Sequence, residues 1–95
     1  MKHAGPAALH ALAPLLAEIR RAMPGVTERK PGTFYFKNTA LLHFHEDPAG
    51  LFADLKVDGT WQRFPVNHSR ETATFLAAWR RRLAALTKAG ARAQQ

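Results

Sequence analysis

The sequence contains no cysteine, which excludes disulfide bonds, thiolate metal sites and cysteine nucleophiles, and which fits a reducing compartment. It also lacks any apolar run near the roughly 18 residues that a membrane-spanning helix requires. His10, Pro14 and Glu18 interrupt the apolar start of the chain, which therefore lacks the continuous apolar block of a signal peptide. From these absences we expect a cytoplasmic protein that does not enter a membrane.

Acidic residues are few: 7 Asp and Glu stand against 14 Lys and Arg, for a net charge of +7. The excess is concentrated from residue 70 onward, where Arg80, Arg81 and Arg82 are consecutive and Glu71 is the one acidic residue. Such a basic patch is typical of a surface that meets nucleic acid or an acidic protein, although it also promotes solubility. The six glycines stand singly, which argues against a Gly-rich phosphate loop.

A chain of 95 residues is long enough for one domain with a modest core, and residues 1–5 and 90–95 are expected to fray. Apolar residues at three- and four-residue steps predict a helix over 6–23, which Pro14 either kinks or splits in two. A second helix is predicted to begin after a cap at Asn67, His68 or Ser69, with Ser69 preferred, and to end at Gly90. The predicted apolar stripes are Leu9, Leu12, Leu16, Ile19 and Met23 in the first helix, and Phe75, Leu76, Trp79, Leu83 and Leu86 in the second.

Between the helices the pattern predicts four strands, over 34–36, 40–46, 51–57 and 60–66, after a connection over 25–32. Asp58-Gly59 is the strongest turn signal, because both central residues of a two-residue hairpin take positive φ. Pro65 cannot donate to a ladder, so the fourth strand should be an edge. The predicted fold is α+β: a two-layer structure with a four-stranded antiparallel meander covered on one face by the N- and C-terminal helices.

The turns set the register, and the register sorts side chains between two faces. Pairing Val57 with Thr60, and then Phe44 with Ala53, gives one apolar face for the helices to cover; it carries Phe34, Phe36, Leu42, Phe44, Leu51, Ala53, Leu55, Val57, Phe64 and Val66. A slip of one residue would bury His43 and His45, at about 1–3 kcal/mol for each unpaired imidazole. The outer face then carries Thr33, Tyr35, Leu41, His43, His45, Phe52, Asp54, Lys56, Trp61, Arg63 and Pro65.

This outer face suggests a binding surface. Tyr35, Phe52 and Trp61 could stack on bases while Lys56 and Arg63 neutralise phosphates. The leading prediction is a small cytoplasmic interaction module that binds nucleic acid or an acidic partner through the open sheet face and the basic C-terminal helix. A homodimer through the sheet face is a further alternative, because an exposed apolar patch usually has a partner. No cofactor is expected in this interpretation.

The alternative is an enzyme centred on His43, His45 and Asp54. The two imidazoles lie on one face of a strand, roughly 6.5–7 Å apart, and with the carboxylate they could hold a transition metal. His43 with Asp54 could equally act as a general base oriented by a carboxylate. The candidate nucleophiles are Thr33 and Ser69, and neither lies in a recognisable nucleophile motif.

Three segments resemble the MmcQ/YjbR-like family of small bacterial proteins. They are Met23-Pro24-Gly25-Val26-Thr27-Glu28, Phe34-Tyr35-Phe36-Lys37 and Leu51-Phe52-Ala53-Asp54-Leu55-Lys56. The resemblance covers roughly residues 15–57. It implies a frataxin-like α+β sandwich, for which DNA binding has been suggested and enzymatic activity is not established, and it assigns no catalytic residue.

Overall fold

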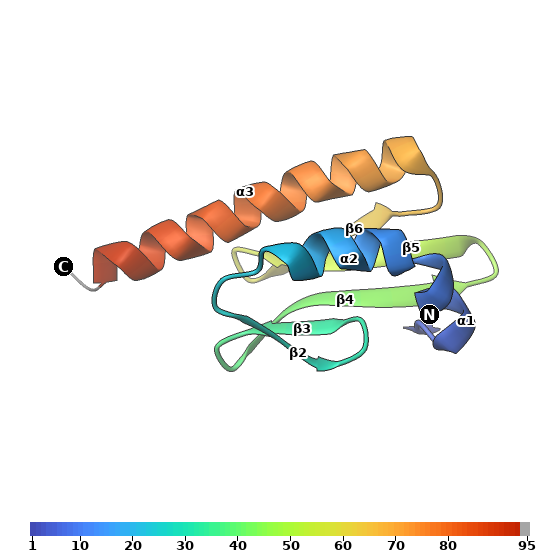
Figure 1. The fold of residues 1–95 in the computed structure, drawn as a ribbon, viewed down its shortest axis with the longest axis horizontal. Helices are drawn as coiled ribbons and strands as arrows, with labels where there is room; N and C mark the ends of the chain where they lie inside the picture. The colour runs from blue at the N-terminus through green and yellow to red at the C-terminus, as the bar shows by residue number, and fades with distance from the viewer. Residues whose placement is uncertain (94–95) are drawn as a thin grey trace.

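The computed structural model describes residues 1–93, with side chains described as far as Lys88. Its elements are β1 (Lys2–His3), α1 (Pro6–Ala11), α2 (Ala13–Arg21), β2 (Val26–Lys30), β3 (Thr33–Phe36), β4 (Thr39–Asp47), β5 (Gly50–Val57), β6 (Thr60–Pro65) and α3 (Ser69–Ala93). The sheet is an antiparallel meander in the order β2-β3-β4-β5-β6, and β1 is added beside β4 (Figure 1). The α+β class, the meander and the edge position of β6 are confirmed.

The sheet has two more strands than predicted. Residues 25–32 were expected to be a connection, but Pro31-Gly32 alone makes the turn, with Gly32 at a φ of +78° as a type II turn requires. Residues 26–30 are therefore free to pair with β3, and Glu28 lies opposite Phe34. Residues 1–5 were expected to fray, but Lys2 and His3 pair with β4.

The central register is as predicted. Asp58 and Gly59 both take positive φ, and Val57 lies opposite Thr60. Glu46 lies opposite Leu51, and Phe44 opposite Ala53. All ten residues predicted for the apolar face belong to the core cluster or pack against it. The histidines of β4 accordingly lie on the face away from this core.

The turn after β3 differs from the prediction, which gave it three residues and paired Phe36 with Ala40. It has two residues, Lys37 takes the positive φ, and Phe36 pairs with Thr39. A bulge at Leu41 then restores the predicted pairing of Phe34 with Leu42. Leu41 was predicted to lie on the outer face, but it is buried in the core cluster.

The N-terminal helical segment is split rather than kinked. α1 ends at Ala11, and α2 begins at Ala13 with Pro14 in its first turn, where the absent N–H costs no hydrogen bond. The predicted apolar stripe continues across the break between α1 and α2, because Leu12 and Leu16 are both buried in the core. In the described residues no helix is both long enough and apolar enough to cross a membrane.

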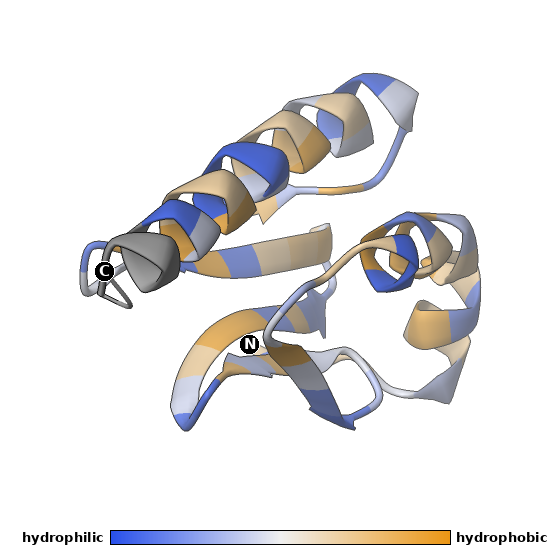
Figure 2. Ribbon diagram, turned by 60° about the vertical axis from the view of Figure 1, so that its left-hand side comes forward, coloured by the Kyte–Doolittle hydropathy of each residue, from blue (hydrophilic) through white to orange (hydrophobic). Residues whose placement is uncertain are grey.

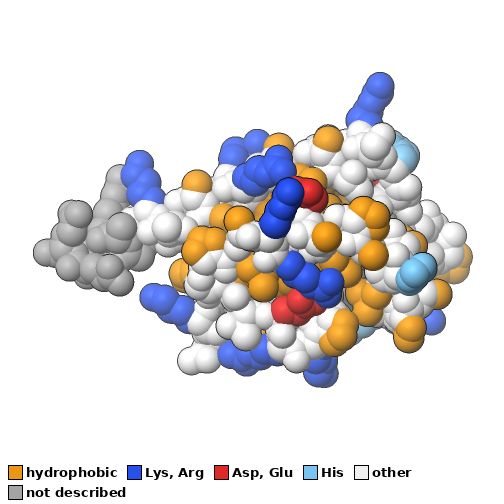
Figure 3. Space-filling view, in the orientation of Figure 1, with side chains coloured by type: hydrophobic (Ala, Val, Ile, Leu, Met, Phe, Trp, Pro, Cys, Tyr) orange, Lys and Arg blue, Asp and Glu red, His pale blue; other side chains and the backbone are white. Residues whose placement is uncertain are grey.

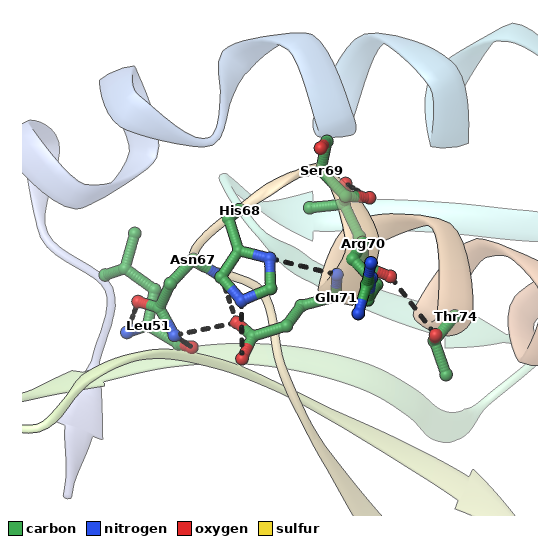
Figure 4. Close-up of polar contacts among 8 residues, drawn as sticks. Leu51, Asn67, His68, Ser69, Arg70, Glu71 and Thr74 are labelled. Atoms are coloured by element: carbon green, nitrogen blue, oxygen red, sulfur yellow. Dashed lines mark hydrogen bonds and ion pairs between the residues drawn. The ribbon is translucent and has the colours of Figure 1, made fainter.

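α3 begins and ends differently from the prediction. Its first backbone hydrogen bond is accepted by the His68 carbonyl, and Nδ1 of His68 accepts from the Glu71 N–H at 3.5 Å (Figure 4). The Glu71 carboxylate in turn accepts from the Asn67 N–H, so His68 and Glu71 cap the helix in place of Ser69. The helix runs through Gly90 to Ala93, and the rest of the end predicted to fray, residues 94–95, lies outside the described residues.

The helices cover one face of the sheet. Leu16 and Ile19 of α2, with Phe75 and Trp79 of α3, are buried in the same cluster as Phe34, Phe44 and Leu55 of the sheet. Figure 2 shows the apolar residues of α3 along the helix above the sheet. Because this layer takes up the inner face, the outer face carries the polar side chains described next.

Candidate metal centre

A row of polar side chains crosses the outer face where the register predicts it. Thr33 pairs with His43, His43 with Asp54, and Asp54 with Arg63, on four neighbouring strands. Alternation along β4 places His45 on the same face as His43. Apart from Leu41, the predicted residues of the outer sheet face are thus brought together in one region.

β1 adds a third imidazole that the sequence did not predict. His3 lies opposite His45 on the adjacent strand, so the two side chains share a face. The ring centroids of His3 lie 4.7 Å from His45 and 5.4 Å from His43. One ring nitrogen from each of the three histidines lies within 4.8 Å of the others. The chain thus brings together three ring nitrogens from two strands.

Two of the imidazoles, His43 and His45, are half-buried, and their pKa values are lowered. Burial lowers the pKa of His43, and the nearby His3 and His45 lower it further. Burial also lowers the pKa of His45, although the Asp54 carboxylate opposes that change. Nε2 of His43 is buried and makes no hydrogen bond in the described residues. Neutral imidazoles are the form that binds metal ions.

Asp54 is held beside the histidines rather than among the ligand atoms. It is 7% exposed, and its two oxygens accept hydrogen bonds of 2.8 Å from Nε and Nη2 of Arg63. These bonds hold the pKa of Asp54 below its ordinary value. Nδ1 of His45 lies 3.0 Å from Asp54 Oδ2, a close approach too bent to be a directed hydrogen bond. The carboxylate predicted to orient His43 therefore contacts His45 instead.

A cleft of about 470 Å³ opens beside the cluster. His3 and His43 lie in its wall, with Thr33 and Tyr35 from β3. The cleft continues along α1 and the β2–β3 turn. Thr33, one candidate nucleophile, is therefore near the imidazoles, whereas Ser69 lies at the start of α3 (Figure 4).

Each aromatic residue predicted to stack on bases has a cationic side chain beside its ring. The guanidinium of Arg29 lies 4.2 Å from the Tyr35 ring centre, and that of Arg63 lies 5.9 Å from Phe52. The Lys56 ammonium lies 5.5 Å from the ring centre of Trp61, which also packs 5.0 Å from His43. These side chains surround the histidines with cation–aromatic contacts, while Trp61 itself stays 42% exposed.

The basic patch does not join this face, because α3 packs on the opposite side of the sheet (Figure 1). Nε of Arg82 donates to the Lys56 carbonyl, and Arg80 lies 3.9 Å from Glu18. Arg81 is exposed. On the side shown in Figure 3, cationic side chains are dispersed among apolar and neutral ones. A single partner contacting both predicted surfaces at once would have to wrap around the domain.

Comparisons of the chain with models of protein families, with curated proteins and with solved structures found no match. The resemblance to the MmcQ/YjbR-like family therefore stays a prediction.

Proposed function

We propose that the protein binds a divalent transition metal ion, with zinc the first choice, through His3, His43 and His45. The main support for this proposal is that three ring nitrogens lie within 4.8 Å of one another on one face of the sheet. In a tetrahedral zinc site such nitrogens are about 3.4 Å apart, since Zn–N bonds are about 2.0–2.1 Å. Small rotations of the rings supply the difference, and the ion would satisfy the unpaired nitrogen of His43.

Asp54 has an outer-shell role in this proposal. Metal-binding histidines usually donate their second N–H to a carboxylate, which fixes the ring and raises its basicity. With His45 bound through Nε2, its Nδ1–H would lie 3.0 Å from Asp54 Oδ2, and a rotation of the ring would align the two as a hydrogen bond. Arg63 holds that carboxylate in place through two hydrogen bonds. This arrangement replaces the predicted metal set of His43, His45 and Asp54 with three histidines supported by Asp54.

The donor set favours a metal-dependent enzyme over a purely structural site. Three histidines leave a fourth position open for water or substrate, as in catalytic zinc sites, whereas structural sites are closed by four protein ligands. Zinc lowers the pKa of bound water to about 7, which supplies a nucleophile at neutral pH. The cleft beside His3 and His43 gives a substrate access to that position. Location in the cytoplasm, suggested by the lack of cysteine, belongs to the same proposal.

The test is a zinc titration by calorimetry. The wild-type chain should bind one zinc ion, and His43→Gln or His45→Gln should weaken binding by more than about 100-fold, beyond the 10–100-fold effect typical of outer-shell partners. His10→Gln is the matched control, because His10 is exposed on α1 and outside the cluster. Zinc binding that survives His43→Gln unchanged, or no zinc binding at all, would overturn the proposal.

Zinc is preferable to copper or nickel in this experiment. Cu²⁺ and Ni²⁺ also bind in a square plane to a single imidazole together with neighbouring backbone nitrogens. Such binding at His3 needs neither residue of β4. A copper titration would therefore report on His3 alone, whereas the zinc titration of the His43 and His45 variants reports on the three-histidine site.

A further inference from the structure

The cleft beside the histidines has two kinds of wall. One is apolar and comes mainly from the N-terminal segment and the β2–β3 turn: Ala4, Pro6, Leu9 and Pro31. The other carries Arg29 and Lys30. A volume of about 470 Å³ falls within the range of small-molecule sites. The cleft is therefore large enough for an organic molecule and larger than a simple inorganic ion requires.

The apolar wall is anchored. Leu9 packs so closely over the turn that a Cβ added at Gly32 would lie 2.8 Å from its Cδ2 atom. The Gly5 N–H also donates to the Glu46 carboxylate at 2.7 Å, which ties the start of α1 to the end of β4. A wall fixed at both places is preorganised for an apolar chain, which lowers the entropic cost of binding.

On the cationic wall, Arg29 is held in place and still has free hydrogen-bond donors. Nη2 of Arg29 donates to the Lys37 carbonyl and the Asn38 side chain, and the guanidinium stacks on Tyr35. Its Nε and Nη1 hydrogens make no hydrogen bond within the described residues. The residues that line the cleft include no Asp or Glu. The local field therefore favours an anion.

Building on the metal site above, we propose that the cleft binds an organic carboxylate with an apolar chain. The carboxylate takes the open coordination position of the metal, Arg29 and Lys30 supply the complementary charge, and the chain lies along Pro6, Leu9 and Pro31. Inorganic phosphate would satisfy the charge but leave the apolar wall in water. A neutral apolar molecule would satisfy the wall but leave the open metal position to water.

Cobalt tests this on the full chain, because a bound Co²⁺ ion has visible absorption bands that respond to its ligands. Cobalt alone is added first, then hexanoate, acetate or inorganic phosphate. Hexanoate should shift the bands saturably and bind about 10-fold or more tightly than acetate, because it buries additional CH₂ groups. Arg29→Gln should weaken hexanoate about 5–10-fold through the lost charge-assisted bonds. Arg70→Gln, an exposed residue on α3, removes the same charge elsewhere and should change nothing.

The outcomes separate the two proposals. If the cobalt bands do not respond to hexanoate, the carboxylate proposal is wrong and the metal-site proposal is unaffected. The carboxylate proposal is also wrong if hexanoate binds no better than acetate or phosphate, or if Arg29→Gln does not change hexanoate binding. If cobalt gives no bands with the wild-type chain, the metal site fails and the carboxylate proposal fails with it.

Discussion

Gly50 occupies a backbone conformation that other residues rarely adopt. Its φ is +137°, and a Cβ added there would lie 2.6 Å from Oδ1 of Asn67. That oxygen accepts the Leu51 N–H at 2.8 Å, so a Gly50→Ala side chain would strain the backbone and displace this contact. We expect Gly50→Ala to lower the free energy of unfolding by about 2–3 kcal/mol, measured by urea denaturation.

Gly59 is the matched control for this prediction. Its φ is also positive, at +80°, but nothing lies within 4 Å of the added Cβ. Gly59→Ala should therefore cost only the backbone strain, about 1 kcal/mol. Equal losses for the two variants would show that the contact with Asn67 contributes nothing.

At the same scale, Asp54 is expected to act on the metal through His45. Asp54→Asn keeps the shape of the side chain but removes the charge that faces Nδ1 of His45. Zinc affinity should fall about 10–100-fold, the effect typical of an outer-shell carboxylate. Asp58→Asn, in the exposed β5–β6 turn, should leave the affinity unchanged. A calorimetric titration of both variants checks this, and an unchanged Asp54→Asn affinity would refute the outer-shell role.

Among the elements, α3 is joined to the sheet by the side chain of Asn67. Its Oδ1 accepts from the Leu51 N–H, and its Nδ2 donates to the Leu51 carbonyl and to Glu71 (Figure 4). Asn67→Ala should destabilise the fold by about 1–2 kcal/mol, read from the urea midpoint. Ser69→Ala should change stability by less than about 0.5 kcal/mol, because the Ser69 hydroxyl makes no hydrogen bond in the described residues. A larger loss for Ser69→Ala would restore Ser69 as the cap.

Glu28 joins α2 to the β2–β3 turn and makes the fold sensitive to acid. Its carboxylate accepts two hydrogen bonds of 2.7 Å from Arg20 and one of 2.9 Å from the Gly32 N–H. These bonds, with those from Arg20 the larger cause, hold the pKa of Glu28 below 4.5. Since the folded state binds the proton less well than the unfolded state, this stabilisation is complete above pH 4.5 and is lost as the pH falls through the folded pKa.

Glu28→Gln should therefore lower stability by about 1 kcal/mol near pH 7, and the difference from wild type should shrink below pH 4.5. Thermal melts across this range measure it. Glu18→Gln is the control, because its carboxylate is more exposed and pairs on the surface with Arg21. A Glu28→Gln difference that stays constant down to low pH would show that the carboxylate charge is not what stabilises the turn.

At the scale of the whole molecule, the sequence predicted those parts of the fold that are determined by local turn sequences. Asp58-Gly59 and the Glu46–Leu51 pairing set the register of β4, β5 and β6, and the register alone placed His43, Asp54 and Arg63 in one row. The missing part was His3. A two-residue strand has no periodicity to detect, and its pairing with β4 spans more than forty residues of sequence. Two of the three clustered histidines were therefore predictable, because they lie on a patterned strand and the third does not.

Because of this long-range pairing, the proposed metal ion would hold β1 and β4 together. β1 has only two residues, and beyond its pairing with β4 the Ala4 N–H donates to the Phe44 carbonyl at 3.0 Å. A bound ion would tie His3 to both histidines of β4, so that opening β1 would require releasing the metal. Zinc at about 100 times its dissociation constant should stabilise the fold by roughly 2.7 kcal/mol. For a domain of this size that corresponds to a rise in Tm of roughly 10–20 °C.

Hydrogen exchange tells whether the metal acts through β1. In the zinc-free protein the Ala4 amide should exchange faster than the Phe44 amide, which donates to the Gly32 carbonyl inside the sheet. Zinc should strongly slow hydrogen exchange at the Ala4 amide. His43→Gln should abolish both this protection and the rise in Tm, whereas His10→Gln should keep both. A rise in Tm without protection at Ala4 would mean that zinc binds elsewhere than between β1 and β4. Protection at Ala4 that persists in His43→Gln would instead mean that the ion binds at His3 without the histidines of β4.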